Sequence, residues 1–173
     1  EKPERFHLKP ADRWILHKLN VLIREVTDNM ERYELGIAVQ NVYDFIWDEF
    51  CDWYLEMAKV RIWKAEYDQD SADYAMWTLR TVLTQALKLL HPFMPFVTEE
   101  IYCTLLPEEE SIMISQWPTV QEEWDFPLYA PVVESVKEAV RGVRNIRAEM
   151  NVPHNKKTKV YIHSVWGKTT SLQ

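Results

Sequence analysis

The sequence predicts an all-α fold, an antiparallel helical bundle that carries a small, incomplete α/β appendage. Apolar residues recur at intervals of three and four through most of the chain, which is the spacing of amphipathic helices. Only three glycines occur in 173 residues, and this disfavours turn-dense β architectures, because tight turns need residues that tolerate a positive φ. Apolar residues make up 47% of the chain, enough for a sizeable core.

The first two helices are predicted over residues 12–30 and 37–63. The first carries one apolar stripe, formed by Trp14, Ile15, Leu19, Leu22, Ile23, Val26 and Met30. The second is apolar almost all round, and a helix with so little polar surface is expected at the centre of a bundle. Trp47 and Trp53 are therefore expected in the core.

A third helix is expected to begin with Ser71 as its cap and to end before Pro92 and Pro95. His91 falls at this end, where we expect it to bond to the last carbonyls of the helix. The fourth helix is predicted to open at Thr98 and to close before Pro107.

Beyond the fourth helix, residues 111–117 have an apolar run that fits a strand or an extended segment. A fifth helix is predicted from Val132 to Met150, and Pro153 ends it. Residues 160–162 look like the first strand of a further unit.

Charge is distributed unevenly along the chain. The net charge is −7, which argues against a protein that coats nucleic acid indiscriminately. Residues 31–130 contain six Lys and Arg against nineteen acidic residues, whereas residues 131–161 contain seven against three. Basic surface is therefore expected only locally.

Catalytic and metal-binding patterns are absent from the sequence. It contains no Gly-x-Ser-x-Gly elbow, no His-Glu-x-x-His helix and no close Cys/His pairs. The carboxylates that recur every four residues on the second helix predict a solvated or salt-bridged face; they are Asp44, Asp48, Asp52 and Glu56. Cys51 and Cys103 are expected to be packed thiols of a cytoplasmic protein, and no segment is apolar enough to predict a membrane span.

Candidate RNA-binding residues lie in three places. Four polar residues lie opposite the apolar stripe of the first helix: Arg13, His17, Asn20 and Arg24. Arg32 and Tyr33 follow in the next turn, where a cation and an aromatic ring offer a place for an unstacked base. A basic row on the fifth helix is formed by Lys137, Arg141 and Arg144, which share one face and suit phosphates.

Four segments carry a resemblance to a known family, in the expected order and over about residues 11–163. They read Asp-Arg-Trp-Ile-Leu at 12–16, Tyr-Asp-Phe-Ile-Trp-Asp-Glu-Phe-Cys-Asp-Trp-Tyr-Leu-Glu at 43–56, Leu-His-Pro-Phe-Met-Pro-Phe-Val-Thr-Glu-Glu-Ile at 90–101 and Val-Arg-Asn-Ile-Arg-Ala-Glu-Met-Asn-Val-Pro at 143–153. The chain resembles the helical anticodon-binding domain of class I aminoacyl-tRNA synthetases, in the bacterial-type valyl-tRNA synthetase branch.

This resemblance implies a partner and a parent enzyme. The partner would be the anticodon stem-loop of valine tRNA, held by the first helix and the turn that follows it. The intact enzyme would attach valine to that tRNA with ATP and Mg²⁺. The family's ATP signatures, His-Ile-Gly-His and Lys-Met-Ser-Lys-Ser, do not occur in this sequence, so the chain alone is expected to bind no cofactor and to be inactive.

The same resemblance suggests a domain division. Residues 1–11 would be a linker from a catalytic body, residues 12–152 the anticodon-binding domain, and residues 153–173 the start of a C-terminal region. The other domains of the same chain would be its partners, in a monomer that does not bind membranes. Two alternatives remain: the equivalent domain of isoleucyl-tRNA synthetase, and a helical protein-interaction module that uses its acidic surface.

Overall fold

Helices dominate the computed structural model, which describes residues 4, 7–64, 66, 68–153, 156–157, 159–164 and 167–172. The chain divides into two units, Glu1–Ala130 and Pro131–Gln173. The all-α prediction is confirmed. The predicted division at residue 152 stays a prediction.

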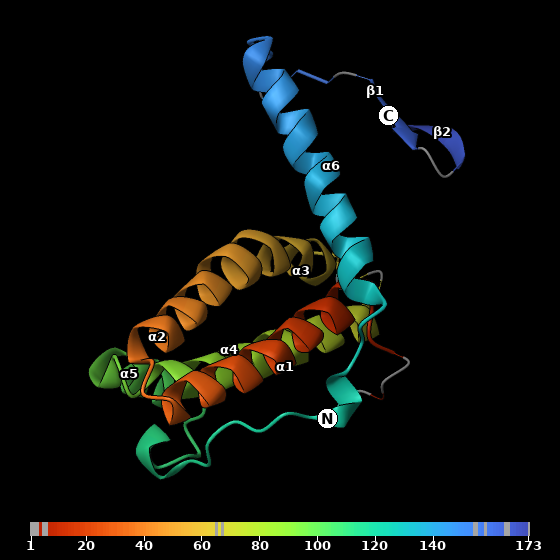
Figure 1. Ribbon diagram of the computed structural model, residues 1–173. Coiled ribbons are helices and arrows are strands. Elements are labelled where there is room, and N and C mark those ends of the chain that lie inside the picture. The colour runs from red at the N-terminus through yellow and green to blue at the C-terminus, as the bar shows by residue number, and fades with distance from the viewer. Residues whose placement is uncertain are drawn as a thin grey trace. The chain divides into compact units, whose positions relative to one another are not determined.

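The first unit is an antiparallel bundle (Figure 1). Its helices are α1 (Pro10–Glu31), α2 (Leu35–Asp44), the π-helix η1 (Phe45–Tyr54), α3 (Leu55–Ile62), α4 (Gln69–Leu90) and α5 (Pro95–Leu105). Two short 3₁₀ turns follow, η2 (Ile112–Ile114) and η3 (Glu122–Trp124). Figure 1 shows α1 and α4 side by side beneath α2 and α3, and α1 contacts α2, η1 and α4.

The apolar stripe of α1 forms the centre of the core. Trp14, Ile15, Leu19 and Val26 have no solvent exposure, and Val82 and Leu89 from α4 are equally buried. The stripe predicted for the first helix is confirmed, because its regular spacing keeps one face directed at α2, η1 and α4.

The second predicted helix is continuous, but its middle is a π-helix and it is not central. Trp47 is 53% exposed, so the prediction that it belongs to the core is wrong; Trp53 is half-buried. A π-helix closes its hydrogen bonds at i→i+5, so its side chains change phase relative to an α-helix. Phe45, Phe50 and Tyr54, which an α-helical wheel spreads around the helix, are therefore all buried in the folded chain.

Two predicted helix starts are also wrong. The cap of α4 is Asp68, whose Oδ1 accepts a 3.0 Å hydrogen bond from the backbone N–H of Ser71, so Ser71 lies inside the helix. Helix α5 begins at Pro95 rather than Thr98, because proline suits the first helical position, where its missing N–H costs no bond.

The connections around α5 differ from the expected ones. Residues 111–117 contain the 3₁₀ turn η2 and no strand. His91 is packed in the connection: its backbone N–H donates to the carbonyl of Leu87 in its own helix at 2.9 Å, while its imidazole binds residues beyond that helix. Its Nδ1 lies 2.7 Å from Oγ1 of Thr98. Because that hydroxyl donates to the carbonyl of Met94 at 2.8 Å, His91 is the donor in this pair.

The second unit contains most of α6 (Tyr129–Glu149) and an antiparallel hairpin of β1 (Val160–Ser164) and β2 (Gly167–Leu172). The strand predicted near residue 160 is therefore confirmed, with Val160 opposite Leu172. Helix α6 confirms the predicted fifth helix with slightly earlier ends. Among the residues that the structure describes, no helix combines the length and the apolar character needed to cross a membrane.

Candidate RNA-binding surface

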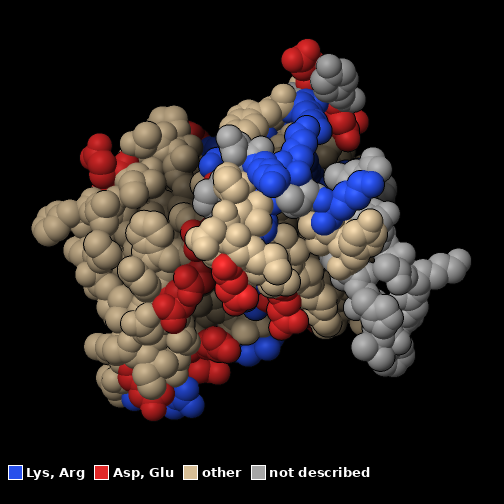
Figure 2. Space-filling model, turned by 90° about the horizontal axis from the view of Figure 1, so that it is seen from above, with Lys and Arg blue, Asp and Glu red and all other residues tan. Residues whose placement is uncertain are grey.

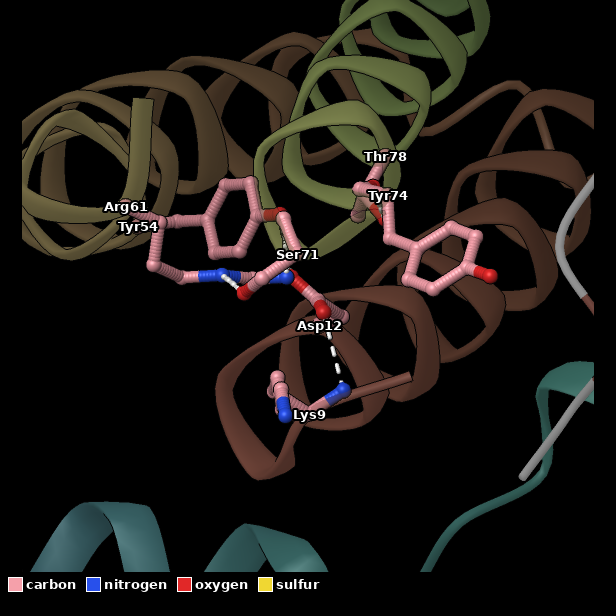
Figure 3. A network of polar contacts seen from close by, with 7 residues as sticks. All are labelled: Lys9, Asp12, Tyr54, Arg61, Ser71, Tyr74 and Thr78. Atoms are coloured by element: carbon pink, nitrogen blue, oxygen red, sulfur yellow. Dashed lines mark hydrogen bonds and ion pairs between the residues drawn. The ribbon is translucent and has the colours of Figure 1, made fainter. Parts of the chain in front are cut away.

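A buried carboxylate joins α1, which carries four of the candidate residues, to its neighbours in the bundle (Figure 3). Asp12 in α1 has no solvent exposure. Its Oδ1 accepts hydrogen bonds from the Tyr54 hydroxyl and from Nη1 of Arg61, both at 2.6 Å, and its Oδ2 accepts from the backbone N–H of Lys9 at 2.9 Å. One side chain therefore links α1 to η1 and α3.

Arg61 extends this junction to α4. Its Nε donates to Oγ of Ser71 at 2.9 Å, and its Nη2 donates to the carbonyl of Ser71 at 2.7 Å. Burial raises the pKa of Tyr54 well above its usual value, and the Asp12 charge raises it further. The phenol therefore stays protonated as a donor, and the junction fixes the position of α1.

Three of the candidate residues on α1 bind a segment of the chain that has little regular structure. Asn20 is 3% exposed; its Nδ2 donates to the carbonyl of Gln121 at 2.7 Å, and its Oδ1 accepts from the N–H of Gln121 at 3.0 Å. Nδ1 of His17 accepts from the N–H of Phe126 at 3.2 Å. We call Arg13, His17 and Asn20, with their partners in residues 121–129, the α1 clamp.

Arg13 completes the α1 clamp through the ring of Tyr129. Its Nη1 donates to the Tyr129 hydroxyl, and its guanidinium carbon lies 4.8 Å from that ring's centroid and 5.7 Å from that of Phe126. Cations are attracted to ring faces at such distances. The structure therefore brings Arg13, His17 and Asn20 together, with their polar groups directed at the chain itself.

Arg24 differs from the three clamp residues because its side chain is exposed. Together with His17, Asn20, Gln121 and Asp125 it lines a pocket of about 440 Å³. The lining of this pocket carries charges of both signs, from Arg24 and from Asp125. Arg24 is thus the candidate on α1 whose charge is most accessible.

The turn after α1 presents a ring and a cation together. Tyr33 is 88% exposed and has a φ of 60°, a left-handed conformation that L residues adopt at an energetic cost. Arg32 is held beside it: Nη2 donates to Oδ1 of Asn29 at 2.7 Å, and Nε lies 3.2 Å from Oε2 of Glu34. The backbone thus directs the phenol outward next to a positioned guanidinium.

The basic row on α6 is part of the second unit. Lys137 forms an ion pair with Glu134, one turn earlier, at 3.1 Å, while Arg141 and Arg144 have exposed side chains. Arg147 donates from Nη2 to the carbonyls of Pro153 at 2.7 Å and Lys156 at 3.1 Å. Arg141 and Arg144 are therefore the accessible members of the row, and Arg147 binds the segment that follows the helix.

The sequence did not reveal the partners of the α1 clamp. Gln121, Phe126 and Tyr129 lie more than 100 residues after the α1 side chains that bind them, and no local pattern connects positions so far apart. Within the described ranges, no group of three or more His, Cys, Asp or Glu is placed to hold a metal ion. Burial raises the pKa of the Cys51 thiol, and the Asp52 charge adds to this effect.

Comparison with known proteins shows the class of domain to which this helical chain belongs. Residues 12–162 match the family described as the anticodon-binding domain of tRNA ligase. This match covers most of the chain, so the chain belongs to that family.

The relatives that it matches include the valine–tRNA ligases of three bacteria. The chain is 51% identical to that of Clostridium acetobutylicum over 152 residues, 49% to that of Clostridium perfringens over 154, and 47% to that of Bacillus anthracis over 156. These alignments cover 88%, 89% and 88% of the chain but 17% of each relative. The chain therefore spans about a sixth of the length of these ligases.

Proposed function

We propose that this chain binds the anticodon stem-loop of valine tRNA. The observation that carries the proposal is the pair formed by Arg32 and Tyr33, a positioned guanidinium beside a ring that is 88% exposed. Single-stranded loops are bound by stacking unpaired bases on aromatic rings, while Arg and Lys contact the backbone. An outward ring on a short turn provides a stacking platform, and membership of the anticodon-binding family supports this assignment.

The candidate residues divide into two roles. Arg24, Arg32 and Tyr33 contact the RNA directly, and Arg141 and Arg144 supply charge for its phosphates. Lys137 is 1% exposed and paired with Glu134, so it does not contact the phosphates. Arg13, His17 and Asn20 act indirectly, because their polar groups already hold residues 121–129 through the α1 clamp.

The wider proposal concerns the parent enzyme. The chain serves as one domain of a cytoplasmic, monomeric valine–tRNA ligase, which uses ATP and Mg²⁺ in its other domains. Its own part is the anticodon-binding domain at residues 12–152, between a linker at 1–11 and a C-terminal region that begins at 153. No residue of this chain is assigned a catalytic role.

Titration with labelled stem-loops of valine and isoleucine tRNA tests the proposal. Tyr33→Ala should weaken binding of the valine stem-loop about tenfold, because a stacked base is lost, and Arg32→Ala should reduce the salt dependence. The matched controls are Tyr43→Ala and Arg80→Ala, which remove an exposed ring and an exposed guanidinium elsewhere.

Three results would contradict the proposal. They are no binding at low salt, equal losses from Arg32→Ala and Arg80→Ala, and tighter binding of the isoleucine stem-loop. The last result would assign the domain to the isoleucyl relatives instead.

A further inference from the structure

The outer side of the segment from α2 to α3 combines acidic and aromatic side chains that the core does not use. Its inner side is buried through Val42, Phe45, Phe50, Tyr54 and Ala58. Asp44, Asp48, Asp52 and Glu56 are all exposed, and Asp44 and Asp48 also line a pocket beside Lys18 of α1. Tyr43 and Trp47 lie beside this row with 55% and 53% of their surface exposed. We call these six residues the outer face.

The two rings of the outer face form one platform. Their centroids are 6.1 Å apart with an interplanar angle of 52°, so both rings offer part of a π face to a ligand. A ring face attracts cations, and arginine binds such faces well because its guanidinium is planar and weakly hydrated. Exposed aromatic residues next to one another are also typical of protein interfaces.

The carboxylates show which charge this face accepts. The amide of Gln40 donates to Asp44 at 2.6 Å, and Lys59 pairs with Glu56. The middle pair, Asp48 and Asp52, lies between these two residues in the sequence, and Asp48 directly follows Trp47. Figure 2 shows acidic side chains gathered on the face of the molecule drawn there. Phosphate is repelled by such a surface, whereas a cationic segment is attracted.

We propose that the outer face is a docking site for an arginine-rich segment of a partner protein. One guanidinium packs on Trp47, and neighbouring arginines pair with Asp48 and Asp52. The site lies on residues that have no part in the proposed stem-loop surface, so the chain can engage RNA and a basic protein segment at different places.

Fluorescence anisotropy with a labelled peptide of alternating Arg and Ala tests this site on the full 173-residue chain. The double variant Asp48→Asn/Asp52→Asn should weaken binding about fivefold to tenfold. Glu109→Gln/Glu110→Gln changes the net charge equally in another acidic, exposed stretch and should weaken it less than about twofold. Trp47→Leu should weaken binding about two- to fivefold, and Phe96→Leu, at a ring that is 90% exposed, should not.

The helical ellipticity of every variant is measured to show that the bundle is intact. Equal losses from the two double variants would overturn the proposal, because they would reflect total charge rather than a site. Wild-type affinity in Trp47→Leu would overturn it as well. Displacement of the peptide by the valine stem-loop would show that the face takes RNA instead, whereas simultaneous binding of both supports the proposal.

Discussion

Nη1 of Arg61 lies 2.6 Å from Oδ1 of Asp12, a carboxylate with no solvent exposure, although the two residues belong to different helices. The remaining N–H groups of the guanidinium bind Ser71 of a third helix. A buried charge that loses its partner is strongly destabilising, because its desolvation is no longer compensated. The stability of the bundle therefore depends on this junction.

Asp12→Ala should lower the free energy of unfolding by about 3–5 kcal/mol, since it leaves Arg61 without its buried partner. Chemical denaturation followed by circular dichroism measures the change. Asp52→Ala is the matched control, because Asp52 is exposed, and it should change stability by less than about 0.5 kcal/mol. A similar cost for both would mean that the junction contributes little.

Tyr54 should make the fold sensitive to alkaline pH. Its folded pKa is raised above the unfolded value, chiefly by burial, so its contribution is complete below the unfolded pKa and is lost as pH rises above it. Unfolding curves at pH 8 to 11 should show stability falling more steeply for wild type than for Tyr54→Phe. The variant itself should be about 1.5–3 kcal/mol less stable at pH 7, because it lacks a hydrogen bond to a charged group. Parallel pH profiles would contradict this role.

Asn20→Ala should release the segment that α1 holds. It removes the partners of both the N–H and the carbonyl of Gln121, at a cost of about 1–3 kcal/mol. Hydrogen exchange at the Gln121 amide should accelerate, while amides in the middle of α4 keep their protection. Arg24→Ala, one turn along at an exposed position, is the control and should leave the exchange of Gln121 unchanged.

Tyr33→Gly should separate stability from binding. Glycine adopts a φ near 60° without the steric cost that an L residue has, so the variant should gain about 0.5–1 kcal/mol in thermal unfolding. It should nevertheless lose stem-loop affinity, because the ring is gone. Tyr33→Ala keeps a Cβ and should show the affinity loss without the gain. Retained RNA affinity in Tyr33→Gly would argue against stacking.

Glu99 should contribute stability that disappears in acid. A hydrogen bond from the Ser111 side chain is the main cause that lowers its pKa, and the thiol of Cys103 and the N–H of Ile112 act in the same direction. Its contribution is therefore present above the unfolded pKa and is lost as pH falls through the lower folded value. Wild type should lose its advantage over Glu99→Gln on acidification. Glu100→Gln, at the exposed neighbour, should show no such convergence.

How far the sequence predicts the fold depends on the range of the interactions involved. The stripe on α1 was predictable because Trp14, Leu19 and Val26 follow one α-helical period and remain on one side. The exposure of Trp47 could not be predicted in this way, because the π-helix η1 changes the direction of every side chain within it. A wheel drawn with one period thus spreads Phe45, Phe50 and Tyr54 around the helix, although all three are buried.

In the candidate site, too, local features could be predicted from the sequence and long-range contacts could not. Arg32 and Tyr33 were found from their place after the first helix, and both are exposed there. Asn20 was expected to meet RNA as a polar residue opposite the apolar stripe, yet it is 3% exposed and bonded to Gln121. Only the tertiary structure shows which polar residues on α1 are already engaged within the chain.

The pairing of Asn20 with Gln121 also affects the order in which the chain can fold. The two residues are separated by 101 positions, and contacts so distant in sequence form only after the entropy cost of closing the intervening loop has been met. Helices α1 to α5 can associate through their apolar faces before that contact exists. During synthesis on the ribosome, the amide of Asn20 cannot obtain its native partner until Gln121 has been added and has left the exit tunnel, so closure of the α1 clamp is expected to be a late event in folding.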